Sequence, residues 1–192
     1  MTDRTYPDAV ADDFPVPPSS FTDREGRTIE IRPYEGTDEE DKALVGMYDS
    51  FDPADRAQGI PPSGESRIRE WLDAILGDDC YNVIAWCDDE VAGHATLVPD
   101  EDAYELAIFV HQTYQRAGIG TYLIRGLLGH GQAAGVEKVW LTVERWNRAA
   151  VSLYKKIGFE TSDAESFELE MGLRLRADDG ATEESAAADG DE

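Results

Sequence analysis

Residues 110–124, VHQTYQRAGIGTYLI, join an apolar strand pattern to a helical pattern through a turn with two glycines. Such a turn can present successive backbone N–H groups, and the positive end of the following helix dipole lets it bind phosphate without a lysine. A Walker loop is excluded because Gly-Lys-Ser/Thr is absent, and the dinucleotide fingerprint is excluded because position 123 is Leu123. The remaining pattern, Q-x-x-G-x-G over residues 115–120, leaves a phosphate loop and a plain strand–helix turn equally open.

A second motif lies one predicted strand later, in WNRAAVSLYKKIGF at residues 146–159. It contains N-x-x-A-V-x-L-Y-x-K-x-G-F, which predicts a helix that ends at Gly158. Together and in this order, the two motifs resemble the GNAT superfamily of acetyl-CoA-dependent N-acetyltransferases, over about residues 28–175. The resemblance favours the phosphate loop, with acetyl-CoA as co-substrate. Asn147 is then both a natural helix N-cap and, by resemblance, a contact for pantetheine.

The resemblance also implies where the cofactor would lie. In the family fold the fourth and fifth strands separate to admit it, and AYELAIFV at 103–110 and KVWLTV at 138–143 are similar to those strands. Backbone N–H groups of the glycine loop would hold the pyrophosphate. Many relatives have glycine in place of Arg116, where a cation could nevertheless assist phosphate binding. The implied cofactor-binding residues are Phe109, Val110, Gln115, Arg116, Ala117, Gly118, Ile119, Gly120, Thr121 and Asn147.

Acetyl transfer to an amine requires a neutral nucleophile and a proton for the departing thiolate. Within the second motif Tyr154 is the expected acid, because a phenol with a pKa of ~10 stays protonated at neutral pH while a thiol has a pKa nearer ~8.5. The alternative is packing, since Tyr154 belongs to an i, i+3, i+4, i+7 stripe that a helix would bury. We expect Tyr154 to be catalytic.

The acceptor must also lose a proton. A lysine at pH 7 lies ~3.4 units below its pKa, so neutralising it costs roughly 4.6 kcal/mol. Glu105 is the first candidate base, because it lies in an apolar strand on the face of Ala107 and Phe109, where burial could raise the pKa of its carboxyl group. The alternative, that Glu105 is a solvated carboxylate without a role in catalysis, is equally open. Glu144, after the next strand, and a water chain are the other routes.

Other reactive side chains are weaker candidates. His111 adjoins the expected thioester site, where a surface role is simpler, while His94 and His130 fall within a strand and a helix. No spacing of His, Cys and Asp predicts a metal site, and we expect none. Cys80 and Cys87 lie outside both motifs, and their odd spacing along one strand predicts opposite faces rather than a disulfide.

The acceptor side of this family usually comes from the first two helices and their connection, here residues 47–72. Within it MYDSFDPADR is similar to the corresponding stretch of GNAT domains that acetylate protein lysines, such as Pat-type enzymes. We therefore expect a protein lysine as acceptor, ahead of a polyamine or aminoglycoside-like amine. A non-catalytic acyl-CoA sensor is the alternative from another functional class. The candidates for attracting and sheltering a cation are Tyr48, Phe51, Asp52 and Asp55.

The formal net charge is −24 and the sequence pI is about 4.2. The acidic residues are spread along the chain, which favours adaptation of the whole surface to concentrated salt, where the screening length falls to ~3 Å at 1 M. Nucleic-acid binding is disfavoured because no basic stripe exists. No apolar run approaches the ~18 residues of a membrane span and no signal-peptide pattern begins the chain. We expect a cytoplasmic, halophilic protein that is a monomer or homodimer.

These motifs need a scaffold of strands and helices to position them. The patterns predict an α/β (α+β) domain over residues 27–176, flanked by a flexible Pro/Asp-rich arm at 1–26 and a disordered acidic tail at 177–192. By resemblance this is the GNAT fold, a central mixed, mostly antiparallel sheet of six to seven strands flanked by about four helices, with splayed central strands. The expected strands are 28–34, 80–86, 90–98, 103–110, 138–143 and 167–175, and the expected helices are 38–51, 64–77, 118–134 and 147–157.

Overall fold

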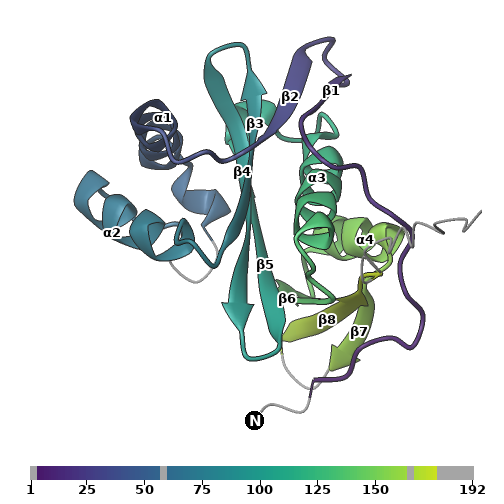
Figure 1. Cartoon of the computed structure of the whole chain (residues 1–192). Coiled ribbons are helices and arrows are strands. Elements are labelled where there is room, and N and C mark those ends of the chain that lie inside the picture. The colour runs from purple at the N-terminus through teal and green to yellow at the C-terminus, as the bar shows by residue number, and fades with distance from the viewer. Residues whose placement is uncertain (1–3, 57–59, 164–166, 177–192) are drawn as a thin grey trace, which may run out of the picture.

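The computed structural model describes residues 4–56, 60–163 and 167–176. Within these ranges the chain forms an eight-stranded sheet in the order β1-β2-β3-β4-β5-β6-β8-β7, with helices on both faces (Figure 1). The strands are β1 Ser19–Thr22, β2 Thr28–Pro33, β3 Tyr81–Cys87, β4 Glu90–Asp100, β5 Ala103–Val110, β6 Lys138–Glu144, β7 Glu160–Asp163 and β8 Glu168–Arg174. The helices are α1 Asp38–Asp49, η1 Pro53–Asp55, α2 Glu65–Ile75, η2 Gln112–Tyr114, α3 Ile119–Ala133 and α4 Arg148–Ile157.

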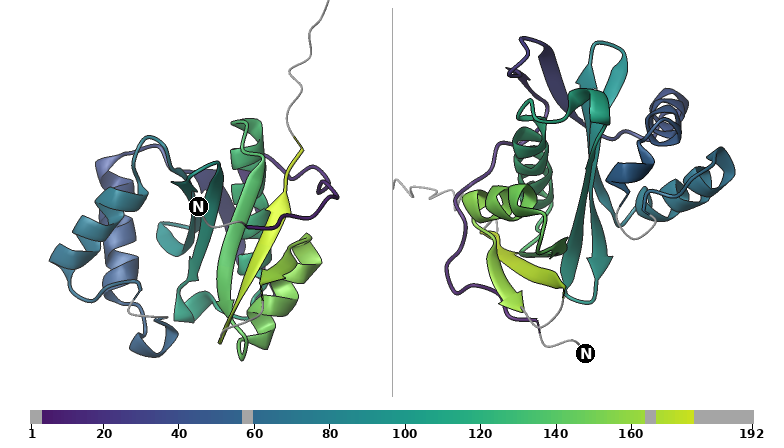
Figure 2. Two further views of the ribbon diagram at one scale, coloured as in Figure 1. Left: turned by 90° about the horizontal axis from the view of Figure 1, so that it is seen from below. Right: turned by 180° about the vertical axis from the view of Figure 1, so that it is seen from behind.

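The two faces of the sheet carry separate hydrophobic cores. Helices α1 and α2 cover one face, and α3 and α4 cover the other (Figure 2). On α2 the spacing of Ile68, Leu72 and Ile75 gives one buried stripe, as predicted from the sequence. Helix α3 lies over the middle of the sheet and buries Leu123 and Leu127 completely. No helix in the described part of the chain is long and apolar enough to cross a membrane.

Neighbouring strands are antiparallel except β5 and β6, which run parallel. These two strands are the predicted pair AYELAIFV and KVWLTV. They pair only through Tyr104 with Val139 and Glu105 with Trp140, near their N-terminal ends. Beyond those pairs they separate toward their C-terminal ends at Val110 and Glu144. The predicted mixed, mostly antiparallel sheet with splayed central strands is therefore confirmed.

The sheet has two more elements than the patterns indicate, so the expected six to seven strands become eight. Strands β1 and β7 have four residues each, with the sequences SSFT and ETSD. Neither shows a hydrophobic alternation that would mark it locally. Each forms because its neighbour, β2 or β8, offers an unpaired edge.

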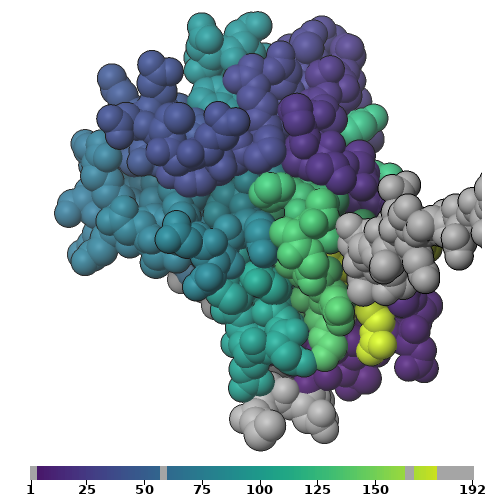
Figure 3. Space-filling model, in the orientation of Figure 1, coloured from purple at the N-terminus to yellow at the C-terminus, as the bar shows by residue number. Residues whose placement is uncertain are grey.

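The N-terminal segment, expected to be a flexible arm over residues 1–26, is packed in its described part. Strand β1 extends the sheet, the Ala11 N–H donates to the Arg174 carbonyl at 2.8 Å, and Phe14 is buried. Gly129 of α3 permits this contact, because a Cβ there would overlap the Pro15 carbonyl oxygen. Figure 3 shows the purple N-terminal segment against the green surface of α3. Residues 1–3 and the acidic tail 177–192 lie outside the described residues.

Candidate functional site

The predicted glycine loop joins β5 to α3 at the open end of the β5–β6 gap. Arg116 and Gly118 both adopt the left-handed region, with φ of +61° and +90°. Backbone N–H groups in such alternating conformations converge to make an anion-binding concavity. Gly118 takes this conformation without strain, whereas a side chain costs Arg116 roughly 1–2 kcal/mol. Arg116 is thus a strained residue at a position where the family resemblance favours glycine.

The backbone conformation of Gly120, the second glycine, does not require glycine. Its φ is not in the left-handed region, and a Cβ would meet Leu153 and Ile108 at 3.7 and 3.8 Å, which is ordinary contact. Glycine within a helix costs up to about 1 kcal/mol relative to alanine. This unexplained cost favours a ligand that needs the space above Gly120. The loop therefore has the features of a phosphate cradle and not only those of a turn.

The side chain of Gln115 fastens the loop to its surroundings. Its Nε2 donates to the Asp55 carboxylate at 2.9 Å and to the Val110 carbonyl at 3.0 Å. Val110 is a predicted partner of pantetheine, so one lone pair of its carbonyl is already in use and a ligand would take the other. The roles of Phe109 and Val110 in cofactor binding stay predictions.

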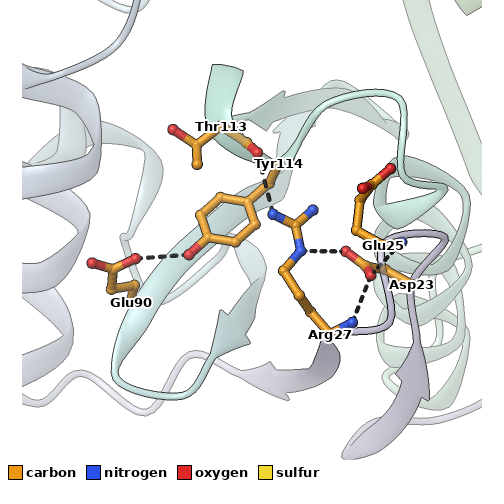
Figure 4. A network of polar contacts seen from close by, with 6 residues as sticks. All are labelled: Asp23, Glu25, Arg27, Glu90, Thr113 and Tyr114. Carbon is orange, nitrogen blue, oxygen red and sulfur yellow. Dashed lines mark hydrogen bonds and ion pairs between the residues drawn. The ribbon is translucent and has the colours of Figure 1, made fainter.

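The hairpin turn between β1 and β2 supports the loop from its outer side, a contact that no local sequence pattern indicates. The buried Asp23 carboxylate accepts hydrogen bonds from the Glu25 N–H and the Arg27 N–H, both at 2.9 Å, and from Arg27 Nε at 2.7 Å (Figure 4). Arg27 in turn donates to the Thr113 carbonyl at 3.3 Å and lies over the Tyr114 ring. Desolvation acts to raise the pKa of Asp23, but the hydrogen bonds from Arg27 and Glu25 outweigh it and lower that pKa.

Tyr154 packs in the core as one interpretation of its motif expects, and its catalytic role stays a prediction. Its side chain is buried on the core-facing stripe of α4 and meets Phe159 edge-on at 5.8 Å between ring centroids. Burial raises the pKa of Tyr154 to about 12, so the phenol keeps its proton at neutral pH. No described residue hydrogen-bonds its hydroxyl, and that oxygen is not sealed from solvent. The proton is therefore not committed to a partner among the described residues.

Glu105 lies farther from the open end than the hypothesis of a direct base requires. It belongs to the last β5–β6 pair, with Trp140, and lies five residues before Val110, which is about 16 Å along a strand at ~3.3 Å per residue. Its side chain is exposed, yet partial desolvation and then the charge of Asp100 raise its pKa, against a smaller lowering by Arg4. Glu105 can therefore act on an acceptor near Val110 only through intervening water. Glu144, the reserve candidate, is at the open end and half-buried.

Asn147 caps α4, as the sequence predicts. Its Oδ1 accepts a hydrogen bond from the Ala150 N–H at 3.2 Å. Its side-chain NH2 has no partner among the described residues and remains able to donate to a ligand. The cap and the predicted pantetheine contact thus use different atoms of one side chain.

The four predicted acceptor residues all have structural contacts. Tyr48 and Phe51 are buried, the Asp52 carboxylate caps η1 by accepting from the Ala54 N–H at 2.8 Å, and Asp55 accepts from Gln115. The same connection is hydrogen-bonded to the segment before the glycine loop through Gln112, as donor to the Ser50 carbonyl and acceptor from the Asp52 N–H. Positions 57–59 of the connection lie outside the described residues.

A buried polar chain lies beneath these helices and was not foreseen. Asn82 Nδ2 donates to the Ile75 carbonyl, so its Oδ1 accepts from His94 Nε2 at 2.8 Å, and His94 Nδ1 accepts from the Tyr48 hydroxyl at 2.6 Å. Burial lowers the pKa of His94 to about 3, which keeps the imidazole neutral. The chain ties α1 and α2 to β3 and β4 behind the Phe109 ring, which meets Tyr48 edge-on.

The remaining histidines and the cysteines do not form a reactive group. His111 accepts a hydrogen bond from the Thr113 N–H and lies 3.1 Å from the Ser50 hydroxyl through Nε2. Cys80 and Cys87 are free thiols. Across the described ranges, no group of three or more His, Cys, Asp or Glu side chains could hold a metal ion.

The comparisons with known proteins agree on one family. The model of the Acetyltransferase (GNAT) family matches residues 29–159. The [Ribosomal protein bS18]-alanine N-acetyltransferase of Salmonella typhimurium is 34% identical over 84 residues, 43% of this chain and 57% of that protein. The chain thus aligns with little more than half the length of this relative.

Two solved structures share the fold. The GNAT domain of S. lividans PAT superposes with a TM-score of 0.68 at 15% identity, over 82% of this chain and 96% of that one. The paia N-acetyltransferase of Thermoplasma acidophilum, in complex with coenzyme A, superposes with a TM-score of 0.60 at 19% identity, over 77% of this chain and 99% of that one.

Proposed function

The chain belongs to the acetyltransferase (GNAT) family, and we propose from this that it transfers the acetyl group of acetyl-CoA to a primary amine. The observation that carries the proposal is the glycine loop at the open end of the β5–β6 gap. Gly120 is free of backbone strain and of close neighbours, so its missing side chain is best explained by a bound phosphate group. Tyr154 on α4 supplies a protonated phenol in the same domain.

The residues present fit acetyl-CoA. Backbone N–H groups of the loop from Gln115 to Thr121 would hold the pyrophosphate, and the exposed guanidinium of Arg116 would add a charge. Phe109 and Val110 would hold the pantetheine and thioester by their backbones, and the free NH2 of Asn147 would donate to pantetheine. When bound, acetyl-CoA supplies the activated acetyl group, and no metal is needed for direct transfer.

The chemical step requires two proton movements. As the amine nitrogen bonds to the acetyl carbon and the carbon–sulfur bond breaks, the nitrogen loses a proton and the sulfur gains one. Tyr154 donates to the sulfur, in concert with bond cleavage because its raised pKa makes it a weak acid. The amine proton leaves through water toward Glu105, whose raised pKa suits a proton acceptor. Proton transfer from the Glu105 carboxyl group to solvent, and from solvent to the Tyr154 phenolate, restores the starting state.

We place a protein lysine first among the acceptors. The face of the gap that carries Glu105 and Thr142 is exposed, which leaves room for a segment of a macromolecule. Trp146 and Phe167 are 75% and 94% exposed beside the open end, and large exposed aromatic side chains favour contact with a protein. The similarity to a ribosomal-protein alanine N-acetyltransferase makes a protein α-amine the second candidate. A polyamine or aminoglycoside-like amine comes third.

The test is an acetyl-transfer assay with matched acceptors. The protein is incubated with acetyl-CoA in multimolar KCl, and free thiol is followed together with the mass of each acceptor. One peptide has a free lysine and a blocked N-terminus, its partner has a free N-terminal alanine and arginine in place of lysine, and spermidine represents small amines. We expect thiol release with the lysine peptide above the rate without amine.

The other results have distinct meanings. Thiol release with the alanine peptide alone, or with spermidine alone, would contradict the assignment of lysine as acceptor. The proposed acetyltransferase activity would still stand. Tight binding of acetyl-CoA without release for any amine would contradict enzymatic activity and favour an acyl-CoA sensor.

A further inference from the structure

We propose that Arg24, in the turn between β1 and β2, binds the pyrophosphate of the cofactor as part of the glycine-loop site. Arg24 precedes the residues 29–159 that match the family model, and none of the residues expected from the sequence to bind the cofactor lies in its segment. The proposal rests on the proposed function, because it assigns a further ligand contact within the same site.

Two contacts place Arg24 at the loop. Its backbone N–H donates to the Ala117 carbonyl at 3.1 Å, which docks the hairpin turn onto the strained part of the loop. Its Nε lies 3.8 Å from the position that a Cβ on Gly118 would occupy, and no other atom outside the immediate neighbours comes within 4 Å of that position. The guanidinium therefore lies beside the first glycine, within reach of a group bound there.

The Arg24 side chain is available for a ligand. It is exposed, and no described residue forms an ion pair or hydrogen bond with it, although the chain has 41 acidic residues. The neighbouring Asp23 carboxylate is already bonded to Arg27 and to two backbone N–H groups. Arg27 is likewise occupied, so Arg24 is the uncommitted cation of this turn.

The turn is rigidly held against the loop on two sides. Beside it, the Asp23–Arg27 pair is joined to η2 through the Thr113 carbonyl (Figure 4). Below it, Phe21 of β1 stacks on Tyr122 of α3, with ring centroids 3.7 Å apart and an interplanar angle of 12°. These contacts fix the Arg24 backbone, so only its side chain has to be ordered on binding.

The positive charge of Arg24 at the glycine loop offsets the negative electrostatic field of the whole protein. The net charge of −24 opposes the approach of a polyanionic cofactor, and both Arg24 and Arg116 are exposed cations at the glycine loop. A charge-assisted contact between guanidinium and phosphate is stronger than a neutral one and is weakened by salt. Arg24 thus supplies local positive charge that backbone N–H groups alone do not.

The experiment measures cofactor affinity by calorimetry for the wild type, Arg24→Gln and Arg24→Lys. The ligands are CoA, 3′-dephospho-CoA and pantetheine, each at 0.2 M and at multimolar KCl. Arg32→Gln is the matched control, because it removes another exposed arginine, located on β2 and paired with Glu30. Thermal unfolding of each variant verifies that the domain is folded.

We expect Arg24→Gln to weaken CoA and dephospho-CoA equally, by about five- to tenfold at 0.2 M KCl, and less at high salt. Pantetheine binding should not change, Arg24→Lys should recover part of the affinity, and Arg32→Gln should match the wild type. Equal CoA affinities for Arg24→Gln and Arg32→Gln would overturn the assignment. So would a loss of pantetheine affinity in Arg24→Gln, or a loss of affinity for CoA without a loss for dephospho-CoA. Failure of the wild type to bind CoA would instead overturn the proposed function, and this assignment with it.

Discussion

The two ends of the Tyr154 side chain have different surroundings. Its ring belongs to the buried stripe of α4, while its hydroxyl lacks a partner among the described residues. Burial disfavours the phenolate, so the same packing that stabilises the helix preserves the proton. The packing and catalytic interpretations are therefore compatible, since they concern opposite ends of the side chain.

At this scale we predict that Tyr154→Phe lowers kcat by about 10²-fold or more, as expected when a general acid is removed. The ring is retained and no hydrogen bond is lost, so the melting temperature and the affinity for CoA should match the wild type. Steady-state kinetics and thermal unfolding provide the measurement. An unchanged kcat would exclude Tyr154 as the acid.

Helix α3 is the element that positions the glycine loop. Its N-cap is Gly118, where φ of +90° requires glycine, and its first turn contains Gly120, where the fold does not require glycine. Its body packs across β3 and β4, so the N-terminus is held at the open end of the β5–β6 gap. The connection after α1 is bonded to the same loop, which joins the expected acceptor side to the cofactor side.

At the element scale we predict opposite effects for the two glycines. Gly120→Ala should raise the free energy of unfolding by about 0.5–1 kcal/mol, because alanine favours the helix and its Cβ meets only ordinary contacts, yet CoA affinity should fall at least tenfold. Gly118→Ala should be destabilising because of its positive φ. Denaturant titration and calorimetry measure both quantities. Normal CoA binding by Gly120→Ala would contradict the phosphate cradle.

The whole molecule is strongly acidic, but its uncommitted cations are not evenly placed. Arg145, Arg148, Lys155 and Lys156 line a groove of about 420 Å³ beside α4. Arg24 and Arg116 add to this set at the glycine loop. The described surface thus offers cations on the α3 and α4 side, where a phosphate-bearing cofactor is proposed to bind, despite the net charge.

Global stability should depend on pH through the buried His94. Its pKa is lowered to about 3 in the folded protein from an ordinary value near 6.5, so between these values the unfolded chain binds the extra proton. Stability from this group is complete above about pH 6.5 and declines as pH falls, by up to ~1.4 kcal/mol per pH unit toward pH 3. We predict that His94→Gln, though less stable at pH 7, loses less stability between pH 7 and pH 4. Denaturant unfolding at constant salt measures this, and equal losses for both proteins would contradict the prediction.

Much of the domain was predictable from local patterns. The period of the apolar residues in α2 and α3, the Asn147 cap and the Gly158 end of α4 are properties of short segments, and the structure confirms them. Strands β1 and β7 were not predictable, because four mostly polar residues become a strand only when another strand offers its edge. The packing of residues 4–26 was missed for the same reason, since Phe14 is buried by surfaces more than a hundred residues away in the chain.

The sequence by itself determined the order of most elements, the two motifs and the residues of the glycine loop, because these depend on neighbours within a few positions. Only the tertiary structure decided that Glu105 lies at the paired end of β5, that Gly120 has no packing reason to be glycine, and that Arg24 stands beside Gly118. Each of these facts depends on how segments far apart in the sequence are placed relative to one another, which no local pattern encodes. The structure thereby favours proton transfer to Glu105 through water over direct transfer. It also places Arg24, from the N-terminal segment, beside the candidate site.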